Sequence, residues 1–222
     1  MLTRPDWARI PGLRHGFLDR AESAGGLAGA VAAVGARLPL DVPRQVHGAR
    51  VLAASAGERP DADGLVTAVP GRLVGVVTAD CVPVLLVGRN ARVAAAVHAG
   101  WRGAVAGVLE AAVGQMATRG AAPGDVEAAI GPAVGACCYE VGAEVRDAFE
   151  ARTGQTTAAA WTAPAGGKYH LDLRRAVALL LEAAGVHSTA LLGPCTACTP
   201  AYCSYRREGS GVGRQLSFVG WS

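Results

Sequence analysis

The sequence predicts a mixed α+β fold, in which helices and many short strands build one large domain of residues 1–222. Short apolar runs rich in valine and alanine are typical of buried strands. They alternate with segments whose apolar residues recur every three or four positions, as in amphipathic helices. No linker interrupts this alternation, and 222 residues with 51% apolar content suit a single substantial core.

In the first half of the chain, small residues over 28–34 predict a helix, and the polar segment 58–64 predicts a loop. Residues 72–78 and 92–97 are short apolar runs bounded by glycine or charged residues, so we expect two buried strands there. An amphipathic helix should follow and end at Gly120, with these residues on its apolar face: Val105, Val108, Leu109, Ala112, Val113 and Met116.

The second half is expected to contain further strands and two more helices. After a strand over 126–130, Gly131-Pro132 marks a turn, and the next helix places Val141, Val145 and Phe149 on one face. Asp172 caps the last helix, which ends at Gly185. Its core-facing residues are Val177, Leu180 and Leu181. The final strands are expected near Leu191, over 202–206 and over 215–219.

Composition argues against several classes of protein. The net charge of +3 arises from 21 basic and 18 acidic residues without a long basic block, which gives no support for nucleic-acid binding. The longest apolar run, residues 73–87, is broken by Asp80 and is shorter than the roughly 20 residues of a membrane helix. The first residues lack a signal-peptide pattern, so we expect a cytoplasmic, reducing location and six cysteines that serve as thiols or ligands.

Three side chains are candidate metal ligands: His47, Cys81 and His98. Cys81 and His98 each directly follow or end a predicted buried strand. Two imidazoles and one thiolate suit zinc or copper, and three protein ligands leave a coordination position open for catalysis. Taken singly, His47 reads as a hydrogen-bonded strand residue and Cys81 as a small core residue. Asp80 and Pro83 beside Cys81 argue against an ordinary strand interior.

Two arginines are candidate anion ligands. Arg102 lies near the first turn of a predicted helix, where free backbone N–H groups add to its guanidinium donors. Arg206 and Arg207 read by default as a solvated charge pair, and strand alternation would turn only one of them toward a site.

The remaining cysteines allow more than one interpretation. Pro194-Cys195-x-x-Cys198 matches part of the zinc nucleobase deaminase pattern, but the sequence contains no His-x-Glu for the catalytic glutamate. A second zinc site of Cys195, Cys198 and Cys203 would lack a clear fourth ligand, which favours reduced thiols. Cys137 and Cys138 are adjacent and point in different directions in most conformations, so a bond between them is not expected.

Several uncommon motifs occur together in a characteristic order. They are Gln45-Val46-His47-Gly48, Thr78-Ala79-Asp80-Cys81-Val82-Pro83, His98-Ala99-Gly100-Trp101-Arg102-Gly103, Gly131-Pro132, Cys138-Tyr139-Glu140-Val141, Leu171-Asp172-Leu173, Cys195-Thr196 and Ser204-Tyr205-Arg206-Arg207. In these motifs the sequence resembles the YfiH-like, or laccase-domain, family, whose members are also described as multicopper polyphenol oxidases and purine nucleoside phosphorylases. The resemblance implies a layered α/β sandwich with mixed β-sheets packed between helices. It also places the family's metal ligands on His47, Cys81 and His98.

The resemblance further implies a zinc-dependent purine nucleoside phosphorylase, with copper as the alternative metal. Its implied substrates are phosphate with adenosine, inosine or S-methyl-5′-thioadenosine, and adenosine deamination is a side activity. Cys81, His98 and Asp80 would be catalytic, with Asp80 orienting a ligand or shuttling a proton. Arg102 and Arg206 would hold phosphate, and Gln45 would contact the substrate. Oxocarbenium-like cleavage of the bond to N9 builds opposite charges on sugar and base, which such a site must both stabilise.

Three other functions remain open at this point. His98 and Cys81 are also the pair that a metal-free cysteine hydrolase needs, for example an amidase that edits peptidoglycan precursors. Copper-dependent phenol oxidation is a second alternative, although one His-Cys-His set is fewer ligands than several copper centres require. The third is a non-catalytic zinc-binding partner protein, which should show a fourth protein ligand.

Overall fold

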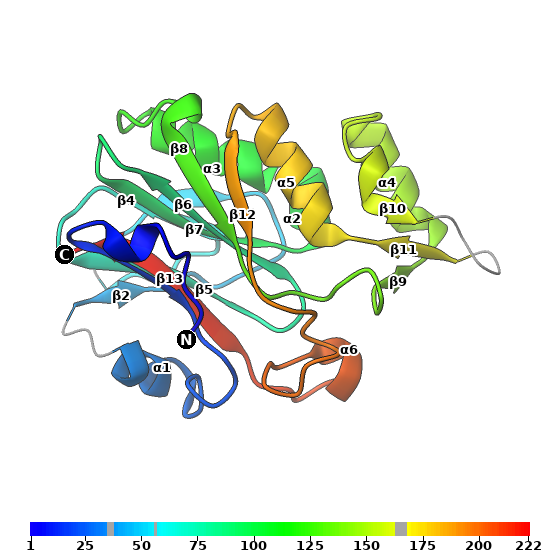
Figure 1. Cartoon of the computed structure of the whole chain (residues 1–222), viewed down its shortest axis with the longest axis horizontal. Coiled ribbons are helices and arrows are strands. Elements are labelled where there is room, and N and C mark those ends of the chain that lie inside the picture. The colour runs from blue at the N-terminus through cyan, green and yellow to red at the C-terminus, as the bar shows by residue number, and fades with distance from the viewer. Residues whose placement is uncertain (35–37, 56, 163–167) are drawn as a thin grey trace.

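Two β-sheets pack face to face, and helices cover both outer faces (Figure 1). The computed structural model describes residues 1–34, 38–55, 57–162 and 168–222. The larger sheet has the order β12 (Ser188–Leu191), β8 (Val126–Ile130), β6 (Val82–Gly88), β7 (Val93–Ala99), β4 (Gly64–Thr67) and β3 (Val51–Ala53). The smaller sheet has the order β1 (Leu13–Phe17), β13 (Gln215–Trp221), β5 (Arg72–Thr78) and β2 (Leu40–Asp41). Both sheets mix parallel and antiparallel pairs, so the predicted layered α+β sandwich is confirmed.

The helices follow the sheets on either side. On the outer face of the larger sheet lie α2 (Trp101–Ala106), α3 (Val108–Ala117) and α5 (Leu173–Ala183), with α4 (Ala143–Thr153) farther out (Figure 1). On the opposite side of the molecule lie α1 (Gly26–Val34) and the short α6 (Tyr205–Glu208). A small sheet of β10 (Trp161–Thr162), β11 (Tyr169–Leu171) and β9 (Glu140–Val141) extends beside α4. The described segments also contain 3-10 helical turns at Trp7–Arg9, Pro123–Asp125 and Ala158–Ala160.

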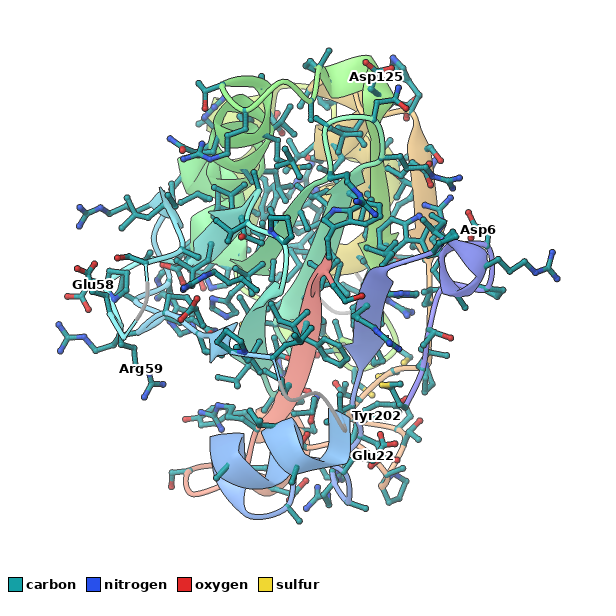
Figure 2. All side chains as sticks on the ribbon, turned by 90° about the vertical axis from the view of Figure 1, so that its left-hand side faces the viewer. Asp6, Glu22, Glu58, Arg59, Asp125 and Tyr202 are labelled. Carbon is teal, nitrogen blue, oxygen red and sulfur yellow. The ribbon has the colours of Figure 1, made fainter. Side chains whose placement is uncertain are left out.

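The two sheets divide the core into three layers, which lie between the helices and the larger sheet, between the two sheets, and between the smaller sheet and α1. In β7, Ala95 and Val97 pack toward the helices, whereas Ala94 and Ala96 pack toward the smaller sheet. Every residue of β6 and β7 is buried, because both faces of these strands are covered. Polar side chains such as Asp6, Glu58 and Asp125 project outward in Figure 2 and are exposed.

Several predicted elements are confirmed with small changes of boundary. The strand over 72–78 is β5, the strand over 126–130 is β8, and the strand expected over 92–97 is β7, which runs two residues further. Strands near Leu191 and over 215–219, the helix over 28–34 and the Asp172-capped helix are also present. The loop over 58–64 is largely irregular chain that gives way to β4 at its last residue.

Three predictions about elements are wrong. The single helix expected after β7 is two helices, α2 and α3, because Gly107 takes a left-handed φ of 92° between them. Val141 belongs to β9 and precedes the helix it was assigned to. The strand expected over 202–206 is replaced by α6, which begins when the Ser204 side chain accepts a hydrogen bond from the N–H of Arg207.

The search for membrane-spanning helices in the described segments finds none, since no helix there has both the length and the apolar character required.

A candidate metal centre where the chain crosses between the sheets

Cys81 and His98 meet because of how β6 pairs with β7. Cys81 lies in the turn that carries the chain from β5 in the smaller sheet to β6 in the larger one. The register places Pro83 opposite His98 and Val82 opposite Ala99. Continued by one residue, this antiparallel register places Cys81 opposite Gly100. Cys81 and His98 then lie diagonally across the two strands on the same face.

His47 reaches the same point from the loop between β2 and β3, held there by Asp63. The carboxylate of Asp63 accepts backbone N–H groups from Val46 (3.3 Å), His47 (2.9 Å) and Gly48 (2.6 Å). These bonds support His47 in a left-handed conformation with a φ of 61°. Asp63 also accepts a 2.8 Å hydrogen bond from Nδ1 of His98, so one carboxylate fixes the backbone of His47 and orients the imidazole of His98.

Two glycines make room for the three candidate ligands. A Cβ on Gly100 would lie 3.1 Å from the sulfur of Cys81 and 3.3 Å from the ring of His47. A Cβ on Gly103 would lie 2.9 Å from the carbonyl oxygen of Gly48, which is backbone and cannot move away easily. Both glycines of the His98-Ala-Gly-Trp-Arg-Gly103 motif are therefore explained by close approach to the site.

The geometry of the three side chains fits a metal ion. Their ligand atoms all lie within 4.8 Å of one another, and Nε2 of His47 is 4.0 Å from the sulfur of Cys81. A tetrahedral zinc ion with bonds of about 2.0–2.3 Å would separate its ligand atoms by about 3.3–3.7 Å. Within the described ranges, this group consists of three side chains, which leaves the open position that a catalytic metal needs.

Without a metal, the site favours a thiolate paired with an imidazolium. Burial opposes the charged form of Cys81, but hydrogen bonds to His47 and His98 outweigh it and lower the pKa of the thiol to about 6. Burial also disfavours the charged form of His98, yet its bonds to Asp63 and Cys81 raise the pKa of the imidazole to about 9. Asp63 is fully buried, and its hydrogen bond to His98 and bonds from Gly48 and His47 outweigh burial and lower its pKa.

The three candidate ligands line a cleft of about 680 Å³, which matches the size of a small-molecule site. His98 forms its buried floor with 3% exposure, whereas His47 is exposed. The other lining side chains include aromatic and basic groups: Trp101, Tyr139, Tyr205, Arg44, Arg59, Arg102, Arg206 and Arg214. The cleft therefore offers ring faces together with positive charge.

Two of these arginines are held on aromatic rings. The guanidinium of Arg102 lies 4.4 Å from the ring centroid of Trp101, at the first turn of α2 as expected. The guanidinium of Arg206 lies 5.5 Å from the ring centroid of Tyr139 and donates to the carbonyl of Glu140. Stacking positions each charge while leaving N–H donors for an anion.

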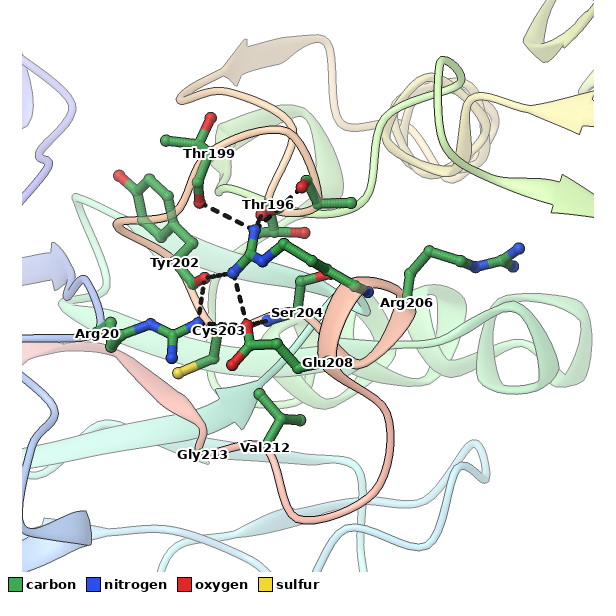
Figure 3. A network of polar contacts seen from close by, with 12 residues as sticks. Arg20, Thr196, Thr199, Tyr202, Cys203, Ser204, Arg206, Glu208, Val212 and Gly213 are labelled. Carbon is green, nitrogen blue, oxygen red and sulfur yellow. Dashed lines mark hydrogen bonds and ion pairs between the residues drawn. The ribbon is translucent and has the colours of Figure 1, made fainter.

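Arg206 and Arg207 contact different parts of the protein, and they lie on a helix and not on the strand whose alternation was expected to separate them. Arg207 turns inward and donates to the carbonyls of Thr196, Thr199 and Tyr202 and to Glu208 (Figure 3). Arg206 extends away from this network in Figure 3 and lines the cleft. One arginine therefore fixes the loop before α6, and the other faces the site.

Asp80 and Gln45 line the cleft but are engaged with the protein. Asp80, at a φ of 92°, accepts 2.6 Å hydrogen bonds from the Thr196 hydroxyl and from the N–H of Arg206. Gln45 both donates to the carbonyl and accepts from the N–H of Val77, each at 2.8 Å. His98 donates its orienting hydrogen bond to Asp63. Asp63, and not Asp80, therefore orients this candidate ligand.

Asp63 is a site residue that the sequence analysis does not predict, since it falls inside the polar segment 58–64. One signal does mark it: it stands between Ala62 and the apolar residues of β4, where an ionisable group is expected only with partners. The lining arginines Arg44, Arg59 and Arg214 were also missed. They come from separate loops, and nothing in their spacing indicates a common cleft.

The cysteines outside this site do not form the group of Cys195, Cys198 and Cys203 that was considered from the sequence. Cys195 and Cys198 lie with Cys137 and Cys138, and not with Cys203. Cys203 is 3% exposed, and its backbone is bonded to the side chain of Gln215. Cys203 thus fills core space, and the trio of Cys195, Cys198 and Cys203, which the sequence analysis considered and did not favour, is not formed.

Comparison with known proteins gives consistent matches. Residues 26–222 match a family model described as multi-copper polyphenol oxidoreductase laccase. A purine nucleoside phosphorylase of Deinococcus radiodurans is 39% identical over 176 residues, covering 79% of this chain and 68% of the relative. A protein named adenosine deaminase RL5, from an unknown prokaryotic organism, is 39% identical and covers 81% of this chain and 74% of its own length. The crystal structure of YlmD from Geobacillus stearothermophilus superposes with a TM-score of 0.81 at 32% identity, covering 98% and 94% of the two chains.

Proposed function

The chain belongs to this laccase-like, YfiH-type family, and from that membership we propose that it is a metal-dependent purine nucleoside phosphorylase. Its proposed substrates are phosphate with adenosine, inosine or S-methyl-5′-thioadenosine, with adenosine deamination as a side activity. Relatives named purine nucleoside phosphorylase and adenosine deaminase, at 39% identity, support this choice. The observation on which the proposal rests is the composition of the cleft. Three candidate metal ligands, which leave one coordination position open, line it together with two arginines stacked on aromatic rings.

Zinc is the proposed metal, held by His47, Cys81 and His98. The donor set of two nitrogens and one sulfur suits zinc, and copper is the alternative. When bound, the ion would supply a Lewis acid for the purine base, which is the leaving group and gains electron density as the bond to N9 breaks. Asp63 keeps Nδ1 of His98 protonated by accepting its hydrogen bond, which turns Nε2 toward the cleft.

The basic side chains of the cleft have a defined part in this reaction. In phosphorolysis a phosphate oxygen forms a bond to C1′ of the sugar while the bond from C1′ to N9 of the purine breaks. Arg102 and Arg206 are proposed to hold the phosphate, because guanidinium groups bind its oxygens in pairs. Their stacking on Trp101 and Tyr139 reduces the side-chain entropy lost on binding.

The experiment measures conversion of inosine and adenosine with and without phosphate, using protein of measured metal content. We expect release of free base to require both phosphate and metal, with Cys81→Ala losing metal and base release together. Arg102→Ala should raise the KM for phosphate, and Arg175→Ala, on exposed α5 surface, serves as the matched control. Full phosphate-dependent activity in metal-free protein would overturn the proposal.

A second candidate, a Cys-His hydrolase acting on amides, is favoured by one observation. The low pKa of Cys81, about 6, and the high pKa of His98, about 9, are those of an activated thiolate and its imidazolium partner. This activity would persist after chelation and be abolished by alkylation of Cys81. Zinc bound by the same thiolate would protect it from alkylation, so the two functions give opposite results with chelator.

A further inference from the structure

Four cysteine side chains from two distant segments converge outside the cleft. Cys137 and Cys138 lie between β8 and β9, and Cys195 and Cys198 lie between β12 and α6. Parallel pairing of β8 with β12 brings these segments out at one edge of the sheet, and Ala133 pairs with Cys195 in a bridge beyond it. The fold therefore aligns the two pairs of thiols.

We propose that this chain binds a second, structural zinc ion through four thiolates, those of Cys137, Cys138, Cys195 and Cys198. The four sulfurs lie within 4.8 Å of one another, with 3.3 Å between Cys138 and Cys198 and 3.6 Å between Cys137 and Cys198. Four sulfurs at about 2.3 Å from a tetrahedral zinc ion are about 3.8 Å apart. A disulfide would instead require about 2.05 Å, and all four cysteines are free thiols.

The backbone around Cys195 is also arranged for a thiolate. The N–H of Gly135 points at the sulfur of Cys195 over 3.1 Å, a contact that stabilises negative charge on sulfur. A Cβ on Gly135 would lie 3.1 Å from Cβ of Cys195 and 3.3 Å from the sulfur of Cys137, so glycine leaves the space that the cluster occupies. Cys195-x-x-Cys198 has the spacing of many structural zinc sites.

Four protein ligands complete the coordination of zinc, so the role of this ion is to hold structure. Of the two segments that it joins, the first lines the cleft through Val134 and Tyr139, and the second is hydrogen-bonded to residues that line it. Thr196, between two of the ligands, donates its hydroxyl to Asp80, and Tyr139, directly after Cys138, stacks with Arg206. Arg207 donates to the carbonyls of Thr196 and Ala197 from the other side. The ion would thus fix the loops that present Tyr139 and Arg206.

The first test counts metal in full-length protein purified with reductant and supplied with zinc. We expect two equivalents per chain, one lost in Cys195→Ser/Cys198→Ser and the other lost in Cys81→Ala. Cys203→Ser, a cysteine of the same loop outside the cluster, should keep both equivalents. A double variant that retains the wild-type zinc content would overturn the proposal.

A second measurement on the unaltered chain keeps the result independent of variant folding. Cobalt in place of zinc should give the intense visible bands and thiolate charge transfer of a four-sulfur site, and these should survive Cys81→Ala. X-ray absorption measures the average number of sulfur ligands per zinc ion. We expect this number to exceed one, the value that the cleft site with its single thiolate would give alone. Four thiols that react freely in zinc-loaded protein, or a disulfide among them after purification with reductant, would overturn it. Failure of the phosphorolysis assay leaves these metal counts unchanged, so the two proposals fail separately.

Discussion

At the scale of single residues, the site combines unusual backbone conformations with hydrogen bonds that support them. His47 and Asp80 have φ angles of 61° and 92°, where residues other than glycine are rare. Such conformations cost about 1–3 kcal/mol each and persist when neighbouring groups over-determine them. Asp63 does so for His47, and Thr196 with the N–H of Arg206 does so for Asp80. Of the three non-glycine residues with positive φ in the described segments, two thus lie beside the proposed metal, and the third, Arg92, lies in the turn between β6 and β7.

Asp63→Asn should weaken zinc binding about 10–100-fold, the usual effect of removing a carboxylate that orients a ligating histidine. The substitution keeps the size of the buried side chain but removes the charge that fixes Nδ1–H of His98. Competition with a fluorescent zinc chelator measures the affinity. Asp61→Asn, two residues away on the exposed surface and paired with Arg44, is the matched control. Equal zinc affinities in the two variants would contradict this role of Asp63.

At the scale of elements, a helix cap can be predicted from the sequence when its partner is close in the chain and the residues around it do not favour a strand. Asp172 was recognised as a cap because its partner is the N–H of Arg175, three residues on. Ser204 has the same kind of partner in Arg207, yet the tyrosine and cysteine around it favoured a strand. The sequence does not predict β6, because Pro83 argues against a strand interior, whereas the equally buried β7 is predicted from its apolar run. The grouping of His47, Cys81 and His98 is predictable from residue types and motifs, whereas the place of Asp63 beside them depends on tertiary pairing.

The break between α2 and α3 gives a prediction about two glycines. Gly107→Ala should destabilise the protein by about 1–2 kcal/mol, because its φ of 92° is costly for a residue with a Cβ. Gly114→Ala should stabilise it by about 0.5–1 kcal/mol, since Gly114 is exposed within α3 and a Cβ there meets nothing within 4 Å. Thermal melts should show shifts of opposite sign. A single continuous helix would instead make both substitutions stabilising.

Strand β1 contains a group that links stability to pH. His15 is buried, and Nε2 accepts a 3.0 Å hydrogen bond from the N–H of Arg4. Burial is the largest cause that lowers the pKa of His15 below its ordinary 6.5. Between the pKa of His15 in the folded protein and 6.5, the unfolded chain therefore binds more protons at His15 than the folded protein does. The stabilisation that comes from the neutral imidazole is complete above pH 6.5 and declines as the pH falls toward the pKa in the folded protein.

The measurement is urea unfolding at several pH values for the native chain and His15→Gln. Glutamine retains a polar side chain but does not titrate, so the difference in unfolding free energy between the two proteins should shrink as the pH falls below 6.5. A difference that stays constant from pH 7.5 to 5 would contradict a buried neutral His15.

At the scale of the whole molecule, both sheets share one core layer, in which Val74 and Val76 of β5 pack with Leu85 and Val87 of β6. Because neither sheet can bury this face alone, we expect one cooperative unfolding transition, as the prediction of a single domain also requires. Calorimetry on metal-free and zinc-loaded protein should give one peak in each state. Two separated peaks in the metal-free protein would contradict it.

The position of Cys81, in the turn that leaves one sheet and enters the other, has a consequence for biogenesis. The proposed ion gathers side chains from both sides of that junction, so a chain in which only one sheet has formed cannot enclose it. Affinity for the cation then reports that maturation is complete, and adding the cation to a folding mixture stabilises the finished molecule by RT ln(1 + [L]/Kd) relative to unfinished chains. Metal supply would in this way select correctly assembled copies over half-assembled ones.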